Sequence, residues 1–298
     1  MPTTESADPL YTDIDIWPAS RAITAMLDGQ VEAIMSIRPI VPLIALASDA
    51  GAQRLRRGGR IFYVGAGTSG RIAVQDGVEL GPTYGWPTER TVFMMAGGIA
   101  ALTVGVEGAE DDRVAAQAEL HANGIGPDDV LIGVAASGKT PYTLSAIEVA
   151  RTAGALTIGV ANNLETPILT VAEFGLCADT GSEIVAGSTR MKAGTAQKAI
   201  LNLLSTSIMI QLGHVYRGMM VDMVISNAKL LRRAQEMVAT LSGCDESASI
   251  AALAASENDI KTAILIASGL SLEGAHALLQ SHGGNLRTAM AAYKIQPV

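Results

Sequence analysis

The chain has 298 residues, of which 49% are hydrophobic and only 4% aromatic, so its core must be built mainly from aliphatic side chains. Charged residues make up 17%, which argues against long disordered regions. The net charge is −8 and no basic run alternates with aromatic residues, so we expect no nucleic-acid partner. This length allows one large domain, or one domain with a smaller companion.

The first part of the sequence gives no sign of secretion or of a membrane. Residues 1–15 are polar and acidic and lack the basic start and apolar stretch of a signal peptide. No stretch approaches about 18 uninterrupted apolar residues, so we expect no membrane partner. Cys177 and Cys244 form no CxxC pair, which is typical of free thiols in a reducing compartment. The predicted location is cytoplasmic.

Residues 1–58 predict an N-terminal helical segment that packs on the core or on a second copy of the chain. Apolar side chains such as Ile23 and Met26 recur at helical spacing. Pro39 and Pro42 divide this helical stretch into two parts.

Five short apolar runs follow, and each of them predicts a β-strand. They alternate with helical stretches, which indicates an α/β fold with a mostly parallel sheet covered on both faces. Ligands of such sheets bind beyond the carboxyl ends of the strands. The five runs are residues 60–64, 91–95, 130–135, 156–160 and 174–177.

The rest of the chain is expected to be helical. Two long helices are predicted between Met191 and about Leu241, with a break near Gly213–Gly218. The Ala-rich tail predicts three or four short helices, which we interpret as a small C-terminal helical domain of UBA-like type. The predicted domains are residues 1–58, 59–241 and 242–298.

A glycine-rich segment, Gly65–Arg71 (GAGTSGR), follows the first predicted strand and opens a helix. Its glycines let the backbone approach an anion closely, and Thr68 and Ser69 add hydroxyl donors. Gly67 and Gly70 also complete the GxGxxG spacing of dinucleotide-binding folds. The residues about 20 positions further on supply no strand ending in an acid for the ribose, which weakens that alternative. A plain strand-to-helix turn is the third interpretation.

A second polar segment, AASGKTPY, follows the third predicted strand. Taken literally, Gly133–Thr140 satisfies the P-loop pattern GxxxxGK[ST]. Its four intervening residues look like the end of a strand rather than a glycine-rich cradle, and no apolar run ends in a magnesium-binding Asp. We therefore favour a second phosphate-binding turn in which Ser137, Gly138 and Thr140 contact the anion.

Two further segments carry candidate functional groups. Gly181–Lys198 gathers hydroxyls and cations around a helix start that Ser188 or Thr189 can cap, and a solvated cap is the alternative interpretation. Its candidates for substrate contact are Ser188, Arg190 and Lys192.

Acidic segments surround Glu79 and Glu110, and two carboxylates near phosphate-binding turns can serve as general acid and base. The alternative for each is an ordinary surface carboxylate. The four histidines show no metal-ligand spacing, and neither Ser69 nor Ser137 lies in a GxSxG elbow.

Together these segments resemble the N-acetylmuramic acid 6-phosphate etherases, which have the sugar isomerase (SIS) fold. The resemblance covers nearly the whole chain in order, including GSTRMKAGTAQK, MVDMVISNAKL, SENDIKTAI and HGGNLR. It implies a five-stranded SIS-type sheet and a carbon–oxygen lyase of peptidoglycan amino-sugar recycling. Such an enzyme cleaves the D-lactyl ether of N-acetylmuramic acid 6-phosphate by elimination and then hydration, giving N-acetylglucosamine 6-phosphate and D-lactate. No metal or nucleotide cofactor is implied, and a homodimer is expected.

The resemblance also implies residue roles. Glu79 matches the proton donor of the family and Glu110 its second essential carboxylate, while Gly67, Thr68, Ser69, Ser137, Gly138 and Thr140 match the phosphate site. A predicted helix C-terminus at Glu79 disfavours negative charge there, as a proton donor needs. The chain departs from the family pattern at Lys139, where Arg is common, and at Gly81, where the family more often has proline.

Two other functions fit the phosphate turns. A sugar-phosphate isomerase of the same fold would not need both carboxylates, and a non-catalytic sugar-phosphate sensor like the glucokinase regulatory protein could lose either. The presence of both Glu79 and Glu110 in their motifs favours the etherase.

Overall fold

The computed structural model describes residues 3–295, which form two compact units. The first, which we call the sheet unit, comprises the chain up to Val78 together with Thr88–Ile208. The second, the helical unit, comprises Glu79–Pro87 and the chain from Met209 onward. The short segment 79–87 therefore belongs to the helical unit although sheet-unit sequence flanks it on both sides. The predicted boundaries at residues 58 and 241 stay a prediction.

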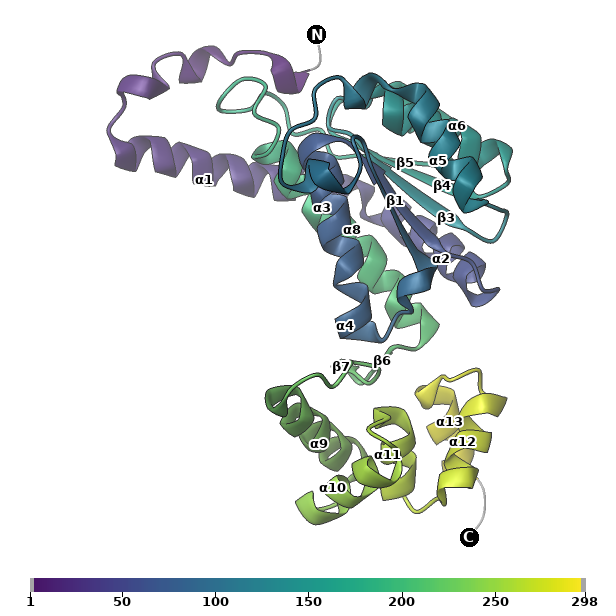
Figure 1. The fold of residues 1–298 in the computed structure, drawn as a ribbon. Helices are drawn as coiled ribbons and strands as arrows, with labels where there is room; N and C mark the ends of the chain where they lie inside the picture. The colour runs from purple at the N-terminus through teal and green to yellow at the C-terminus, as the bar shows by residue number, and fades with distance from the viewer. Residues whose placement is uncertain (1–2, 296–298) are drawn as a thin grey trace. The chain divides into compact units, whose positions relative to one another are not determined.

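A five-stranded parallel sheet forms the centre of the sheet unit, with strand order β2-β1-β3-β4-β5 (Figure 1). All five predicted strands are present. The chain leaves β1 toward β2 but leaves β3 toward β4 on the opposite side, so the strand order reverses between β1 and β3. The strands are β1 Ile61–Gly65, β2 Thr91–Met95, β3 Val130–Val134, β4 Leu156–Ala161 and β5 Phe174–Cys177.

Helices cover both faces of this sheet. The residues of β1, β3 and β4 are therefore buried. On one face Leu120 and Ile147 pack with Phe62 in an apolar cluster. On the other, buried positions such as Ile44 and Ala47 recur at helical spacing along one helix that packs on β4 and β5. The first face carries α5 (Arg113–Asn123), α6 (Pro141–Thr152) and α7 (Pro167–Val171), and the second carries α2 (Val41–Arg56), α3 (Gly67–Val78) and α8 (Lys192–Leu212) (Figure 1).

A buried carboxylate fixes α3 against β1 and α8. Asp76 of α3 accepts hydrogen bonds from Tyr63 Oη (2.7 Å), Asn202 Nδ2 (2.5 Å) and Ser205 Oγ (3.2 Å). Burial raises the pKa of Asp76, and these three hydrogen bonds only partly oppose that rise. The helix that opens at the glycine-rich segment is thus held firmly at its far end.

The N-terminal residues form three short 3₁₀ turns and one long helix before α2. The predicted division of the helical stretch at its two prolines is confirmed, because a further 3₁₀ turn separates the two helices. These elements are η1 (Thr3–Glu5), η2 (Pro9–Tyr11), η3 (Ile14–Ile16), α1 (Ala19–Met35) and η4 (Arg38–Ile40). Three more 3₁₀ turns follow later in this unit, η5 (Thr88–Arg90), η6 (Ile99–Leu102) and η7 (Ala109–Asp111).

The helical unit contains a short helix from segment 79–87, a small antiparallel hairpin and five C-terminal helices. Side-chain caps at Asn227, Asp245, Asp259 and Ser271 accept backbone N–H groups at four of the helix starts. Its elements are α4 (Leu80–Tyr84), β6 (Val215–Tyr216), β7 (Met219–Met220), α9 (Ala228–Ser242), α10 (Glu246–Ala255), α11 (Ile260–Ala267), α12 (Leu272–Ser281) and α13 (Leu286–Ile295).

The connection between α8 and α9 is longer than the sequence predicts. A break was expected only near Gly213–Gly218, but α9 begins at Ala228, after the β6–β7 hairpin and a loop. Apolar side chains of this connection, including Val221 and Met223, are buried in the core of the helical unit. These apolar side chains led to the prediction of a helix, whereas in the structure they belong to a loop that they hold against the core.

Candidate functional site

The two predicted phosphate turns lie side by side at the carboxyl edge of the sheet. Gly65, the last residue of β1, pairs in register with Val134, the last residue of β3. The segments that follow these two strands therefore leave the sheet at the same level, on either side of the point where the strand order reverses. Such a point is where open α/β sheets bind their ligands.

The glycine spacing of the first turn has a steric cause. A Cβ atom on Gly65 would lie 2.8 Å from the Gly70 backbone, and one on Gly70 would lie 2.8 Å from Gly65. Gly67 has φ +53° and opens α3, which is twelve residues long. The backbone turns sharply enough to direct the first N–H groups of α3 toward the edge of the sheet, where they can bind an anion.

The second turn has comparable geometry at the start of α6. Gly138 has φ +63°, and a Cβ there would meet Thr166 Oγ1 at 2.1 Å. The Lys139 N–H donates to Ser137 Oγ at 3.2 Å. Thr140 occupies the cap position of α6 but makes no side-chain capping hydrogen bond, so its hydroxyl stays available to a ligand.

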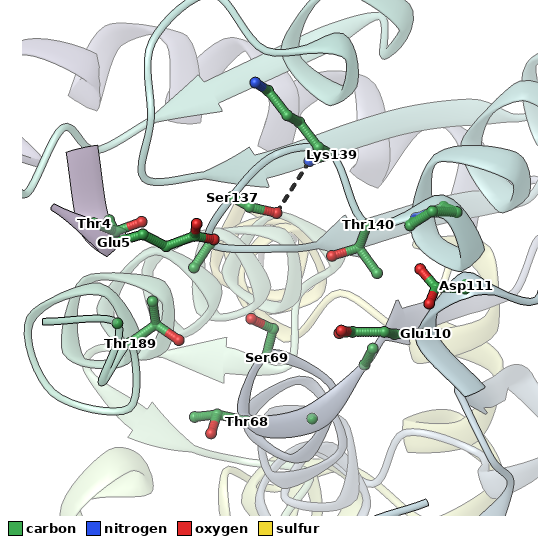
Figure 2. Close-up of a pocket in the computed structure, with 15 residues that line it drawn as sticks. Thr4, Glu5, Thr68, Ser69, Glu110, Asp111, Ser137, Lys139, Thr140 and Thr189 are labelled. Atoms are coloured by element: carbon green, nitrogen blue, oxygen red, sulfur yellow. Dashed lines mark hydrogen bonds between the residues drawn. The ribbon is translucent and has the colours of Figure 1, made fainter. Parts of the chain in front are cut away.

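One cavity of about 390 Å³ unites the two turns. Figure 2 shows the hydroxyl groups of Ser69 and Thr140 and the carboxylate of Glu110 turned toward a common space, whereas the Lys139 amine extends away from it. The lining residues are Thr4, Glu5, Ala66, Gly67, Thr68, Ser69, Glu110, Asp111, Ala136, Ser137, Lys139, Thr140, Pro141, Gly187 and Thr189.

Glu110 reaches this cavity from η7, directly before α5. Asp112 caps α5 by accepting the Ala115 N–H at 2.8 Å, so the backbone that carries Glu110 is fixed by the helix start. Asp111 also lines the cavity. Glu110 thus lies just before a helix start, and its catalytic role remains a prediction.

Glu5 is a lining residue that the sequence did not reveal. Its neighbour Thr4 is fully buried, donates its N–H to Asn163 Oδ1 at 3.3 Å and accepts from Asn163 Nδ2 at 3.0 Å. The Gly187 N–H also donates to the Thr4 carbonyl at 3.2 Å. These contacts hold the N-terminal segment at the carboxyl edge of the sheet, and no local pattern around Glu5 predicts an attachment 159 positions away.

The segment Gly181–Lys198 contributes less directly than predicted. Thr189 lines the cavity, whereas Ser188, Arg190 and Lys192 are not among its lining residues. The start of α8 is capped by Glu183, whose two carboxylate oxygens accept the Lys192 and Ala193 N–H groups at 2.9 Å each, in place of the expected Ser188 or Thr189. A carboxylate suits this position because the helix N-terminus carries partial positive charge.

Glu79 belongs to the helical unit, where it is exposed and precedes α4. The predicted helix of the glycine-rich segment ends at Val78, so Glu79 lies at the junction of α3 and α4. Within residues 3–295, no three His, Cys, Asp or Glu side chains are grouped so as to hold a metal ion.

The parallel sheet with two hydroxyl-bearing turns at its switch point has the SIS fold. The family described as the glucokinase regulatory protein N-terminal SIS domain matches residues 44–151, and the SIS domain family matches residues 113–207. A putative phosphosugar isomerase involved in capsule formation from Bacteroides fragilis has a similar fold. Its TM-score is 0.52 and its identity 19%, over 67% of this chain and 95% of that chain.

Similarity to named relatives extends over almost the whole chain. The N-acetylmuramic acid 6-phosphate etherase of Deinococcus radiodurans is 46% identical, covering 96% of this chain and 94% of the relative. That of Streptomyces avermitilis is 42% identical, covering 97% and 94%. The chain belongs to the N-acetylmuramic acid 6-phosphate etherase family.

Proposed function

We propose that this enzyme cleaves the D-lactyl ether of N-acetylmuramic acid 6-phosphate and releases D-lactate and N-acetylglucosamine 6-phosphate. The observation that carries the proposal is the single cavity in which both hydroxyl turns and the Glu110 carboxylate meet. Relatives that match this chain over nearly their full length are named after that activity. The reaction class is a carbon–oxygen lyase in amino-sugar recycling.

The 6-phosphate binds between the starts of α3 and α6. Gly67, Thr68 and Ser69 offer N–H and hydroxyl donors from the first turn, and Ser137, Gly138 and Thr140 offer them from the second. Two helix N-termini add partial positive charge at the same edge of the sheet. The net charge of −8 does not oppose this, because recognition of the phosphate is local.

Glu110 acts at C2 of the sugar. In the open-chain sugar the C1 aldehyde acidifies the C2 proton, which the Glu110 carboxylate accepts to leave an enolate. The C3–oxygen bond then breaks and a C2–C3 double bond forms. Glu79 gives a proton to the departing lactate oxygen. Water then adds its oxygen to C3, and C2 regains a proton, so the sum is hydrolysis of the ether. Each proton transfer by a positioned carboxyl contributes about 10² to 10⁴ in rate.

A second copy of the chain covers the apolar side of α1. Ile23, Leu27 and Val31 recur every four residues and are 60%, 61% and 56% exposed, although they are large and apolar. Figure 1 shows α1 extending away from the sheet of its own unit. Sedimentation should give a dimer mass, and Leu27→Glu should give the monomer mass; a monomeric unmodified protein would contradict the homodimer.

The enzyme is expected in the cytoplasm. One stretch of the described residues, 19–56, is long and apolar enough by length and composition to cross a membrane. Its second half is α2, which packs on β4 and β5 through buried residues. That packing favours α2 as a core helix of the sheet unit, preceded by α1 as the helix that contacts a second copy. Cell fractionation of the full chain tests the location.

The decisive experiment supplies N-acetylmuramic acid 6-phosphate to the purified protein and measures D-lactate. Release of lactate without added metal or nucleotide supports the lyase. Interconversion of sugar phosphates without lactate would support the isomerase, and thermal protection by the sugar phosphate without any turnover would support the sensor.

A further inference from the structure

The segment that carries Glu79 is attached to the connection between α8 and α9. The Val224 N–H donates to the Pro82 carbonyl of α4 at 3.1 Å. Gly85 ends α4 with φ +62°, and a Cβ there would lie 2.6 Å from the Asp222 carbonyl oxygen. Only glycine allows so close an approach, so the backbone of segment 79–87 lies directly against the loop around Asp222.

The Asp222 side chain is the centre of a mostly buried charge cluster. Its Oδ2 lies 2.7 Å from His214 Nδ1 and 2.5 Å from Lys261 Nζ. The three side chains are 17%, 19% and 10% exposed. Lys261 also donates to the Gly284 carbonyl at 2.9 Å, so one ammonium group joins α11, the turn before α13 and the loop around Asp222.

The cluster reaches back to the Glu79 segment through an aromatic contact. Trp86 is 3% exposed, and its ring lies edge-on to the His214 ring with centroids 6.2 Å apart. Such edge-to-face pairs are favourable and depend on orientation. The order of contact is therefore Lys261, Asp222, His214 and Trp86, all within the helical unit.

Three sequence motifs that the proposed reaction does not use converge at this cluster. Asp222 lies in MVDMVISNAKL, Lys261 in SENDIKTAI and Gly284 in HGGNLR. Gly213, with φ +88°, lies against the Asn285 amide close to this cluster. Asn285 in turn accepts the N–H groups of Arg287 and Thr288 at the start of α13. Burying an ion pair is a poor way to gain stability, but it selects one arrangement of the groups that it joins.

We propose that Asp222, held by Lys261 and His214, is a positioning residue that fixes the segment carrying Glu79 within the helical unit. The inference rests on the proposed role of Glu79 as proton donor. It gives the C-terminal helices a task in catalysis, because α11 and the turn before α13 provide the ammonium group and its second acceptor.

The test uses the full-length enzyme and the variants Asp222→Asn and Lys261→Met. Misplacing a catalytic group by about 1 Å can cost about 100-fold, so we expect kcat for lactate release to fall at least about tenfold. KM should change by less than about threefold, because the phosphate turns belong to the sheet unit. Exchange of the C2 proton with deuterated solvent should persist, since Glu110 performs it.

Two further variants separate positioning from general damage. Lys261→Arg keeps the positive charge and should recover part of kcat relative to Lys261→Met. Tyr293→Phe removes the hydrogen bond from Tyr293 Oη to the Ser268 carbonyl (2.9 Å) elsewhere in the helical unit and should leave kcat unchanged. A Lys261→Met enzyme with a lower melting temperature and unchanged kcat would overturn the inference.

A further variant tests the positioning role if the first two variants do not fold. If Lys261→Met and Asp222→Asn do not fold, His214→Asn keeps the Asp222–Lys261 pair and removes only the imidazole that contacts Trp86; unchanged kcat in that variant would overturn the inference equally. Glu79→Gln separates the proposed donor role of Glu79 from the positioning role of Asp222. Full lactate release by Glu79→Gln refutes the proposed donor, whereas an inactive Glu79→Gln beside a fully active Asp222→Asn refutes the positioning role alone.

Discussion

The two edges of the same parallel sheet use polar groups in opposite ways. At the amino edge, Asp129 precedes β3 and accepts from the Arg60 N–H (2.8 Å), from Arg60 Nη2 (2.8 Å) and from the Gly126 N–H (2.9 Å). At the carboxyl edge, the hydroxyls and carboxylates around Ser69, Thr140 and Glu110 face an open cavity. Polar groups that satisfy one another hold the sheet, and those directed into the cavity remain free to bind and react.

The pKa shifts of two buried carboxylates, Asp129 and Asp76, also depend on the groups that contact them. Burial alone would raise the pKa of Asp129, but hydrogen bonds and charge from Arg60 and the Gly126 N–H lower it overall. Burial raises the pKa of Asp76, whose hydrogen-bond donors Tyr63, Asn202 and Ser205 are all neutral. The hydrogen bonds and charge around Asp129 therefore outweigh the effect of burial, whereas those around Asp76 do not.

The largest expected effect is at the carboxyl edge. Glu110→Gln keeps the size of the side chain but removes the base, so kcat for lactate release should fall by about 10² to 10⁴. Steady-state kinetics with a melting curve measures this, and the melting temperature should stay within about 2 °C because Glu110 is exposed. Glu107→Gln is the matched control on the same loop, since Glu107 is exposed and outside the cavity lining. Equal losses in both variants would contradict the assignment of Glu110.

The second largest effect is expected at the amino edge, where a substitution should lower stability and leave kcat unchanged. Arg60→Met leaves the buried Asp129 carboxylate without its cation, which should lower the free energy of unfolding by about 3 kcal/mol. The kcat of the remaining folded enzyme should not change. Urea unfolding provides the measurement, and Arg57→Met is the control, because the Arg57–Asp128 pair is about half exposed at 51% and 47%. Exposed pairs contribute about 1 kcal/mol or less, so equal losses would contradict the comparison.

A smaller change in binding is expected from the second turn. Ser137→Ala removes one hydroxyl donor to the phosphate, and hydrogen bonds to charged groups contribute about 1.5–3 kcal/mol. KM should therefore rise by about tenfold or more while kcat stays close to that of the unmodified enzyme. Thr152→Ala serves as the control, since Thr152 lies at the other end of α6 and its hydroxyl donates to the Glu148 carbonyl at 2.9 Å. A loss confined to kcat would show that Ser137 acts on the reacting carbons instead.

Features that depend on neighbouring residues could be predicted from the sequence, whereas contacts between distant residues could not. The five strands and the position of the two turns after β1 and β3 are confirmed, because apolar runs and glycine spacing are properties of neighbouring residues. Glu5 was missed because its position depends on a hydrogen bond from Thr4 to Asn163.

The same limit applies to two buried charges. Glu183 caps a helix that begins nine residues later, through side-chain oxygens that no capping motif predicts. Lys261 lies on α11 and Asp222 in the loop before α9, so the sequence around either residue does not predict the pair. The loop before α9 was assigned to helix because buried apolar residues look alike in helices and loops until the fold places them.

The smallest expected effect is a difference in pH dependence between Asp129 and Asp76. The lowered pKa of Asp129 means that its stabilising contribution is present above the unfolded value, about 3.9, and is lost as the pH falls through the folded value. The raised pKa of Asp76 has the opposite sign, so its contribution is present below about pH 3.9 and is lost as the pH rises through the folded value. Urea midpoints measured from about pH 3 to 7 should show that Asp129→Asn flattens the acid side of the stability curve. Asp76→Asn should instead remove a decline above about pH 4, and identical curves for the two variants would contradict the opposite directions of the two pKa shifts.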